Sequence, residues 1–305
     1  MENNPLISIL CLCYNQEKFI VESLESIKAQ TYKNFEILIC DDYSKDKSVN
    51  IINEWFGNNR DLNVQFLIHT ENKGICKSLN ELLALSNGKY LQILALDDLL
   101  EKDKIERHVA ILEKSNYNEV MVFSDAYLID KDSKRFQNTF IPYHYKFLSL
   151  ETGNYYNLLL ADNMIPAMSG LMKSSIIKSI GGWDENLTFE DYDMWLRLSK
   201  NFDFIYDKIN SCSYRLHGSN SHKKGNFLSL SLFDIYIKHK EEPSIKKKLL
   251  QIVDAAYLQG NLAEKHKTYL LHNGNKTFKE KLILRDTNLS IYSFILSMRK
   301  IFYGY

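Results

Sequence analysis

Two short apolar runs in the first hundred residues each end in a pair of aspartates. The pairs are Asp41 and Asp42 after residues 35–40, and Asp97 and Asp98 after residues 90–96. In an open α/β sheet, ligands bind beyond the carboxyl ends of the strands, so both pairs would lie at one edge. Crowded carboxylates repel one another unless a cation neutralises them. The pattern therefore predicts a divalent-metal site that receives a phosphate or diphosphate.

The spacing of apolar residues alternates between strand and helix along the first half of the chain. Strand-like runs lie at residues 6–13, 35–40, 64–69, 90–96 and 119–129, and helical spacing lies at residues 17–30, 46–56, 75–85 and 103–114. Such alternation predicts an α/β fold with a mainly parallel, mixed sheet between helices. Residues 164–172 and 202–206 also resemble pieces of sheet. We expect a catalytic domain over residues 1–225 and a helical, Lys-rich region over residues 226–305.

Composition narrows the function classes. The 305 residues are 45% hydrophobic and 25% charged, as in soluble globular proteins. Equal numbers of basic and acidic residues, 38 of each, argue against a nucleic-acid partner. The five cysteines include no C-x-x-C pair, which favours reduced core thiols. Since no signal-like segment precedes the first apolar run, we expect a cytoplasmic location.

The acidic pairs suggest two roles at the sheet edge. Asp42 can accept the imide N–H of a uracil or a ribose hydroxyl. Asp98, with Asp97 beside it, can offer hard oxygen ligands to Mg²⁺ or Mn²⁺. The alternative for both pairs is that they cap the helices that follow.

A third acidic cluster follows a Gly-Gly-Trp sequence. Glu190 and Asp191 precede a helical pattern whose N-terminus would hold a carboxylate ionised, near the ordinary pKa of about 3.9. Asp191 could then accept a proton from an acceptor hydroxyl. Trp183 could stack on a sugar face, with buried packing as the alternative.

The polar stretch after residues 202–206 contains Arg215 and His217. An arginine and a histidine at this spacing suit diphosphate oxygens and a metal ion. A lone histidine is more often structural, and that alternative stays open.

Taken together, these motifs resemble the inverting nucleotide-sugar glycosyltransferases of family 2, which have the GT-A fold. The resemblance covers residues 7–221. It rests on the following segments, which keep the family's order: Ser8-Ile9-Leu10 with Tyr14-Asn15, residues 29–36, Asp41-Asp42-Tyr43-Ser44, Asn72-Lys73-Gly74, Gly88-Lys89-Tyr90, Asp97-Asp98, Gly181-Gly182-Trp183-Asp184-Glu185, Glu190-Asp191 and Arg215-Leu216-His217. The family often has Asp where this chain has Ala95, and Pro-Thr at Leu12 and Cys13.

The resemblance implies roles for named residues. Asp42 contacts the nucleobase, usually uracil, beside Tyr14 and Asn15, and Asp191 is the general base. The resemblance also places Asp97 and Asp98 at the metal motif, with Asp98 the ligand of Mn²⁺ or Mg²⁺ and His217 on the metal or diphosphate. With the residue-level arguments above, we expect further substrate contacts from Asp97, Trp183, Glu190 and Arg215. The implied reaction moves a sugar from a nucleotide donor, typically a UDP-sugar, to a glycan hydroxyl with inversion.

The last residues combine basic and apolar side chains. Residues 279–305 interleave Leu, Ile and Phe with Lys and Arg, a composition that can lie on an anionic membrane surface. A peripheral position on the inner face of the membrane would favour a polyprenyl-diphosphate-linked glycan acceptor for polysaccharide synthesis. The alternative is a helix packed on the rest of the chain.

Two other functions would leave different marks on the sequence. A nucleotidyltransferase would carry a Gly-rich basic loop after the first strand, which residues 13–17 are not. A non-catalytic scaffold that binds nucleotide sugars is favoured slightly by Ala95. The joint presence of Asp42, Asp98, Asp191 and His217 argues against the scaffold.

Overall fold

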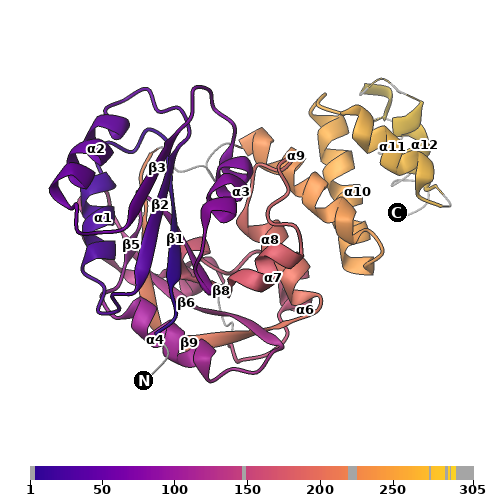
Figure 1. Cartoon of the computed structure of the whole chain (residues 1–305). Coiled ribbons are helices and arrows are strands. Elements are labelled where there is room, and N and C mark those ends of the chain that lie inside the picture. Colours follow the sequence, from indigo (N-terminus) through magenta and orange to yellow (C-terminus); the bar gives the residue numbers. More distant parts are fainter. Residues whose placement is uncertain are drawn as a thin grey trace. The chain divides into compact units, whose positions relative to one another are not determined.

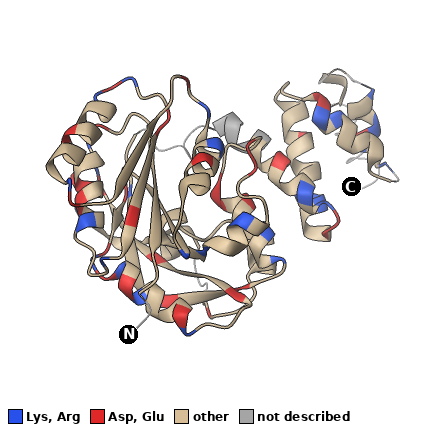
Figure 2. Cartoon of the chain, in the orientation of Figure 1, with Lys and Arg blue, Asp and Glu red and all other residues tan. Residues whose placement is uncertain are grey.

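The computed structural model describes residues 4–145, 149–218, 225–274, 276–285, 288 and 290–292. The chain divides into two compact units, Met1–Lys224 and Gly225–Tyr305 (Figure 1). Acidic and basic residues are interspersed along the ribbon of both units (Figure 2).

Within the described part of the first unit, one sheet of nine strands forms the core. Its order is β3-β2-β1-β4-β8-β6-β9-β5, and β7 pairs with β6 at the side. The strands are β1 (Ile7–Cys13), β2 (Phe35–Asp41), β3 (Val64–Ile68), β4 (Tyr90–Ala95), β5 (Leu99–Leu100), β6 (Glu119–Ile129), β7 (Arg135–Thr139), β8 (Leu171–Lys173) and β9 (Asp203–Arg215). The four strands from β3 to β4, and the pair β6–β9, run parallel. Antiparallel pairing joins β8 to β4 and β6 and joins β5 to β9, so the predicted mixed, mainly parallel sheet is confirmed.

Helices cover the sheet on both faces, as Figure 1 shows for α1 and α2 against α3. They are α1 (Ile20–Lys28), α2 (Ser48–Asn58), α3 (Ile75–Leu85), α4 (Lys104–Glu113), α5 (Phe140–His144), α6 (Tyr156–Ala161), the short 3-10 helix η1 (Ala167–Ser169), α7 (Ser174–Ser179) and α8 (Asp191–Ser199). Every residue of β1 is buried, as expected for a parallel strand covered on two faces. The apolar residues of α1 and α4 join those of β1 in one core, and all five cysteines are free and buried.

Two sequence predictions for this unit were wrong in extent. Of the predicted segment 164–172, only Leu171 and Met172 belong to a strand, β8. The residues before them form η1 and loops whose apolar side chains are also buried. The segment 202–206 continues as β9 to Arg215, since its polar second half pairs with β6.

The second unit is helical in the residues that the structure describes. It contains α9 (Gly225–Tyr236), the 3-10 helix η3 (Ile237–His239), α10 (Pro243–Leu258), α11 (Glu264–His272) and α12 (Phe278–Leu284). In α12, Leu282 and Ile283 are buried, whereas Phe278 is 41% exposed. Much of the basic and apolar segment 279–305 lies outside the described residues. A search of the described residues finds no helix with the length and apolar character needed to cross a membrane.

Candidate active site

Three neighbouring strands end at the same edge of the sheet. Cys13 at the end of β1 lies opposite Asp41 on β2, and Leu12 lies opposite Ala95 on β4. The loops that follow these strands are therefore adjacent, as the sequence pattern predicted. Several hydrogen bonds join the first two loops. Among them, the Asn15 backbone N–H donates to Ser44 Oγ at 2.8 Å, and the Lys45 N–H donates to Asn15 Oδ1 at 2.7 Å. Tyr14, beside Asn15, is 48% exposed.

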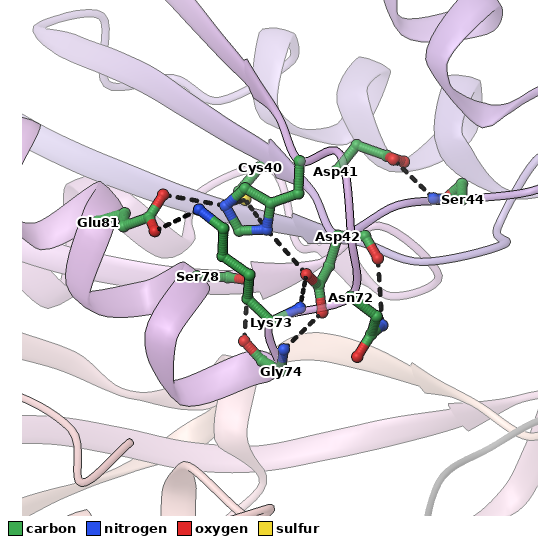
Figure 3. Close-up of polar contacts among 10 residues, drawn as sticks. Cys40, Asp41, Asp42, Ser44, Asn72, Lys73, Gly74, Ser78 and Glu81 are labelled. Carbon is green, nitrogen blue, oxygen red and sulfur yellow. Dashed lines mark hydrogen bonds and ion pairs between the residues drawn. The ribbon is translucent and has the colours of Figure 1, made fainter. Parts of the chain in front are cut away.

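Asp42 anchors the loop that leads into α3 (Figure 3). Its Oδ1 accepts the backbone N–H of Lys73 at 2.7 Å, and its Oδ2 accepts that of Gly74 at 2.9 Å. Oδ1 also lies 2.8 Å from Nδ1 of the buried His69. The next helix in sequence, α2, begins at Ser48 and has no side-chain cap at its N-cap residue, so the capping alternative for Asp42 is wrong.

Asp41 is fully buried beside Asp42. Its Oδ1 accepts the Ser44 N–H at 2.8 Å, while its Oδ2 has no hydrogen-bond partner among the described residues. An acceptor left unsatisfied in a protein interior costs free energy unless a ligand or water supplies a donor. Asp41 Oδ2 is therefore available to accept a hydrogen bond from a ligand or a water molecule.

The second acidic pair meets the end of β9. His217 Nε2 lies 2.9 Å from Asp97 Oδ2, and the Arg215 backbone N–H donates to Asp98 Oδ1 at 2.8 Å. Burial, and then the charge of Asp97, raises the pKa of Asp98 well above its ordinary value. Since α4 begins at Lys104 after Asp103, neither member of the pair caps that helix.

Arg215 occupies a position that sequence did not suggest. Its side chain is fully buried, with Nε donating to the Asp97 carbonyl at 2.7 Å and an Nη donating to Glu22 at 2.7 Å. The other Nη donates to the Asp130 carbonyl and to Ser133. The guanidinium thus fixes the turn that carries the acidic pair, and a direct contact with diphosphate would require it to leave these acceptors.

The donor set at this turn suits a hard divalent cation. Asp97, Asp98 and His217 supply carboxylate oxygens and an imidazole, which are ligands of Mg²⁺ and Mn²⁺. Burial, and then the charge of Asp97, raises the pKa of Asp98 and so disfavours its ionised form, a cost that a bound cation would offset. Over the residues that the structure describes, no group of three or more His, Cys, Asp or Glu side chains is already arranged around a metal position.

Glu190 and Asp191 lie at the N-terminus of α8, both partly buried. Asn163 Nδ2 donates to Asp191 Oδ2 at 2.9 Å, and the Tyr192 N–H donates to Oδ1 at 2.6 Å. Burial and the charge of Asp191 raise the pKa of Glu190 to about 8, and burial raises the pKa of Asp191. The prediction of an ordinary pKa near 3.9 was wrong, because burial outweighs the favourable end of the helix dipole.

Trp183 is 3% exposed, which matches the packing alternative in this structure. Asn80 holds its backbone from both sides, accepting its N–H at 2.9 Å and donating to its carbonyl at 2.8 Å. The preceding Gly182 has a φ of 70°, and a Cβ there would lie 2.5 Å from Asn80 Oδ1, so a larger residue would displace this loop. Stacking of Trp183 on a sugar stays a prediction.

Two residues of this edge were missed by the sequence reading. Asn163 contacts Asp191, and His69 contacts Asp42. The only sequence signal for His69 is its position at the end of the strand-like run 64–69, and Asn163 lies in a segment without periodicity. Neither signal separates a site residue from a loop residue.

Comparison with known proteins identifies the family. The sequence model of glycosyl transferase family 2 matches residues 8–179. An uncharacterised glycosyltransferase of Methanocaldococcus jannaschii is 30% identical over 209 residues, which are 68% of this chain and 69% of that protein. One of Rickettsia bellii is 30% identical over 225 residues, which are 72% of this chain but 31% of that protein. This chain therefore spans about a third of the length of the Rickettsia relative.

Solved structures share the fold. The mannosyltransferase PcManGT of Pyrobaculum calidifontis, in complex with GDP-Man and Mn²⁺, superposes with a TM-score of 0.61 at 16% identity over 99% of this chain and 88% of that one. TarS 1–349 of S. aureus, in complex with UDP, gives a TM-score of 0.58 at 16% identity over 90% and 76%. These likenesses show that the chain has the GT-A fold, and the family match shows that it belongs to glycosyl transferase family 2.

Proposed function

We propose that this chain is an inverting glycosyltransferase that moves a sugar from a UDP-sugar to a hydroxyl of a glycan acceptor. The observation that carries the proposal is the convergence of the Asp42 loop, the Asp97–Asp98 turn and the end of β9 at one sheet edge. The family and the glycosyltransferase relatives support it. Solved neighbours that bind UDP or GDP-Man support a nucleotide-sugar donor.

In this proposal, the nucleobase of the donor binds at the loops that follow β1 and β2. Asp42 accepts the imide N–H of uracil, and Tyr14 and Asn15 border the same pocket. Asp98 and His217 would hold Mn²⁺ or Mg²⁺, and Asp97 beside them would contact the ribose and diphosphate. When bound, the cation offsets the negative charge that develops on the leaving nucleoside diphosphate.

On the acceptor side, Asp191 takes the proton of the attacking hydroxyl. A general base works best when its pKa lies near the working pH, and the raised pKa values of Asp191 and Glu190 move in that direction. Asn163 donates to Asp191 Oδ2 and so fixes the direction in which the carboxylate faces. A single displacement follows, in which the hydroxyl attacks the anomeric carbon and inverts its configuration.

The test is calorimetric binding of UDP, GDP, CDP and dTDP, with and without Mn²⁺, to the wild type and to Asp98→Asn. We expect selective UDP binding that needs the metal and weakens in the variant. Binding that ignores both the metal and Asp98, or no binding of any nucleotide, would contradict the proposal and favour the scaffold.

We also propose that the acceptor is a polyprenyl-diphosphate-linked glycan reached from the cytoplasmic face of a membrane, as in polysaccharide synthesis. The basic and apolar residues of segment 279–305 support this part of the proposal. Flotation with anionic and neutral vesicles tests it, using the full chain and the charge reversal Lys281→Glu with Arg285→Glu. Equal recovery of both proteins with anionic vesicles would contradict membrane contact through this segment.

A further inference from the structure

His69 lies between two carboxylates behind the proposed nucleobase pocket. Its Nδ1 is 2.8 Å from Asp42 Oδ1, its Nε2 is 2.9 Å from Glu81 Oε2, and its side chain is 1% exposed. A neutral imidazole donates from one nitrogen only, so its other nitrogen would face a carboxylate oxygen lone pair to lone pair. The imidazolium form donates to both carboxylates.

The charges around His69 balance only when it is protonated. Lys73 Nζ lies 3.0 Å from Glu81 Oε1, so Lys73 and His69 together offset the charges of Asp42 and Glu81. Hydrogen bonds from His69 and Lys73 outweigh burial and lower the pKa of Glu81, which keeps that carboxylate ionised. The remaining neighbour, Cys40 Sγ at 3.5 Å from Nε2, stays a neutral thiol because burial raises the pKa of Cys40 to about 12.

The same contacts determine what Asp42 can still bind. A carboxylate has about four acceptor positions. Three are taken, two on Oδ1 by Lys73 N–H and His69 and one on Oδ2 by Gly74 N–H. Figure 3 shows Asp42 facing the Lys73–Gly74 backbone. One acceptor position therefore remains, on Oδ2, and in the ionised form it can only receive a donor.

We infer that His69 is a positioning residue for the donor nucleotide: as an imidazolium held between Glu81 and Asp42, it keeps Asp42 ionised with one free acceptor for a base that carries an imide N–H. The inference rests on the proposed function. Uracil offers such a donor, whereas the N3 of cytosine is itself an acceptor. Affinity for uridine nucleotides should then depend on the protonation of His69, and affinity for CDP should not.

The experiment is calorimetry of UDP and CDP, with saturating Mn²⁺, from about pH 6 to about pH 8.5. The proteins are the wild type, His69→Gln and Glu81→Gln, with His272→Gln on the exposed face of α11 as the matched control. Because the diphosphate and the metal site titrate alike in each protein, the ratio of wild-type to variant affinity isolates His69. Thermal unfolding verifies that each variant folds.

We expect His69→Gln to bind UDP about tenfold more weakly than the wild type wherever the wild-type ring carries two protons, and equally well wherever it carries one. Glu81→Gln should bind UDP like the wild type only at lower pH, since one carboxylate no longer stabilises the imidazolium. CDP affinity and His272→Gln should not change.

Two results would overturn the inference while the proposed function stands: a His69→Gln protein that binds UDP with the wild-type affinity and pH profile, or equal losses for UDP and CDP. If the wild type binds no nucleoside diphosphate, the proposed function fails first. Nitrogen-15 NMR of the His69 ring in the wild type is a separate readout. A singly protonated ring at about pH 6 overturns the inference without any nucleotide or variant.

Discussion

The acidic residues at the sheet edge differ in how many hydrogen-bond donors they receive. We call the loops around Asp42 the nucleobase side, and the Asp97–Asp98 turn with Glu190 and Asp191 the reaction side. On the nucleobase side, Asp42 receives two backbone N–H groups and the His69 ring. On the reaction side, Asp98 and the Glu190–Asp191 pair have fewer donors and raised pKa values. The protein therefore fills three of the four acceptor positions of Asp42, whereas burial disfavours the ionised form of the carboxyls on the reaction side, a cost that a bound cation would offset at Asp98.

The largest expected effect lies on the reaction side. Asp191→Asn removes the proposed base but keeps the shape of the side chain, so kcat should fall about 100-fold to 10,000-fold. UDP affinity should stay within about twofold, because nothing changes on the nucleobase side. Initial rates and calorimetry measure both quantities. A large rate loss in Glu190→Gln, with Asp191→Asn unimpaired, would instead assign the base to Glu190.

The pH dependence of the reaction tests the proposed base, and that of Glu190 tests the crowding of this pair. The rate should rise with pH as Asp191 loses its proton, because only the ionised base accepts one. Asp191→Asn removes the charge that helps to raise the pKa of Glu190 and should lower that pKa by about one unit. An unchanged Glu190 pKa in the variant, followed by carboxyl-carbon NMR, would show that the two carboxylates do not interact.

The same pair predicts the sign of a stability effect. An unfolded Glu titrates near about 4.3, while Glu190 in the folded chain has a pKa of about 8. The folded state therefore holds the proton more tightly, and this contribution to stability is full below about pH 4.3 and is lost as the pH rises through about 8. Denaturant titrations across this window should show a shallower decline in Glu190→Gln than in the wild type. Equal slopes would contradict the raised pKa.

A matched pair of amide substitutions compares the two sides directly. Asp42→Asn places an NH₂ against a donor, either the Lys73 or the Gly74 N–H, and should lower the free energy of unfolding by about 1–3 kcal/mol. Asp98→Asn keeps an oxygen for the Arg215 N–H and removes the crowded charge, so without metal it should unfold no more easily than the wild type. Denaturant melts with a chelator present decide the comparison. Equal destabilisation by both changes would remove the distinction.

The smallest expected effect concerns the hydrogen bond from the Asn15 N–H, in the loop after β1, to Ser44 Oγ, in the loop after β2. Ser44→Ala removes the acceptor of the Asn15 N–H and should cost about 0.5–1.5 kcal/mol of stability. Ser115→Ala is the control, since that hydroxyl bonds a nearby carbonyl in its own helix turn. If UDP affinity falls more in Ser44→Ala than in the control, the loop junction matters for binding as well as folding.

Sequence predicted the parallel half of the sheet well. The predicted helix 75–85 and strand 119–129 coincide with α3 and β6. Apolar residues recur at regular spacing where a helix or strand buries one face against the sheet, so this spacing identifies such elements. It failed in residues 164–172, where the apolar side chains are buried in loops, and in the second half of β9, where buried polar residues such as Ser211 bond within the sheet.

Sequence predicted which residues lie at the candidate site better than it predicted the contacts that they make there. Strand ends brought Asp42 and Asp98 to one edge, because parallel strands share their carboxyl ends. The buried position of Arg215 could not be predicted, because its partners Glu22 and Asp130 lie far away in sequence. The raised pKa of Glu190 depends on surrounding atoms that no local motif specifies.

The bonds of Arg215 also bear on the order in which the chain matures. Its N–H and guanidinium reach Asp98, 117 residues earlier, and Glu22, 193 residues earlier. During synthesis the N-terminal strands can pair long before β9 leaves the ribosome. The Asp97–Asp98 turn can form its hydrogen bonds with Arg215 only after β9 has been made. Contacts at such separation form late and slowly. A nascent chain would thus possess its sheet before its reactive edge, which delays activity until nearly the whole first unit has been made.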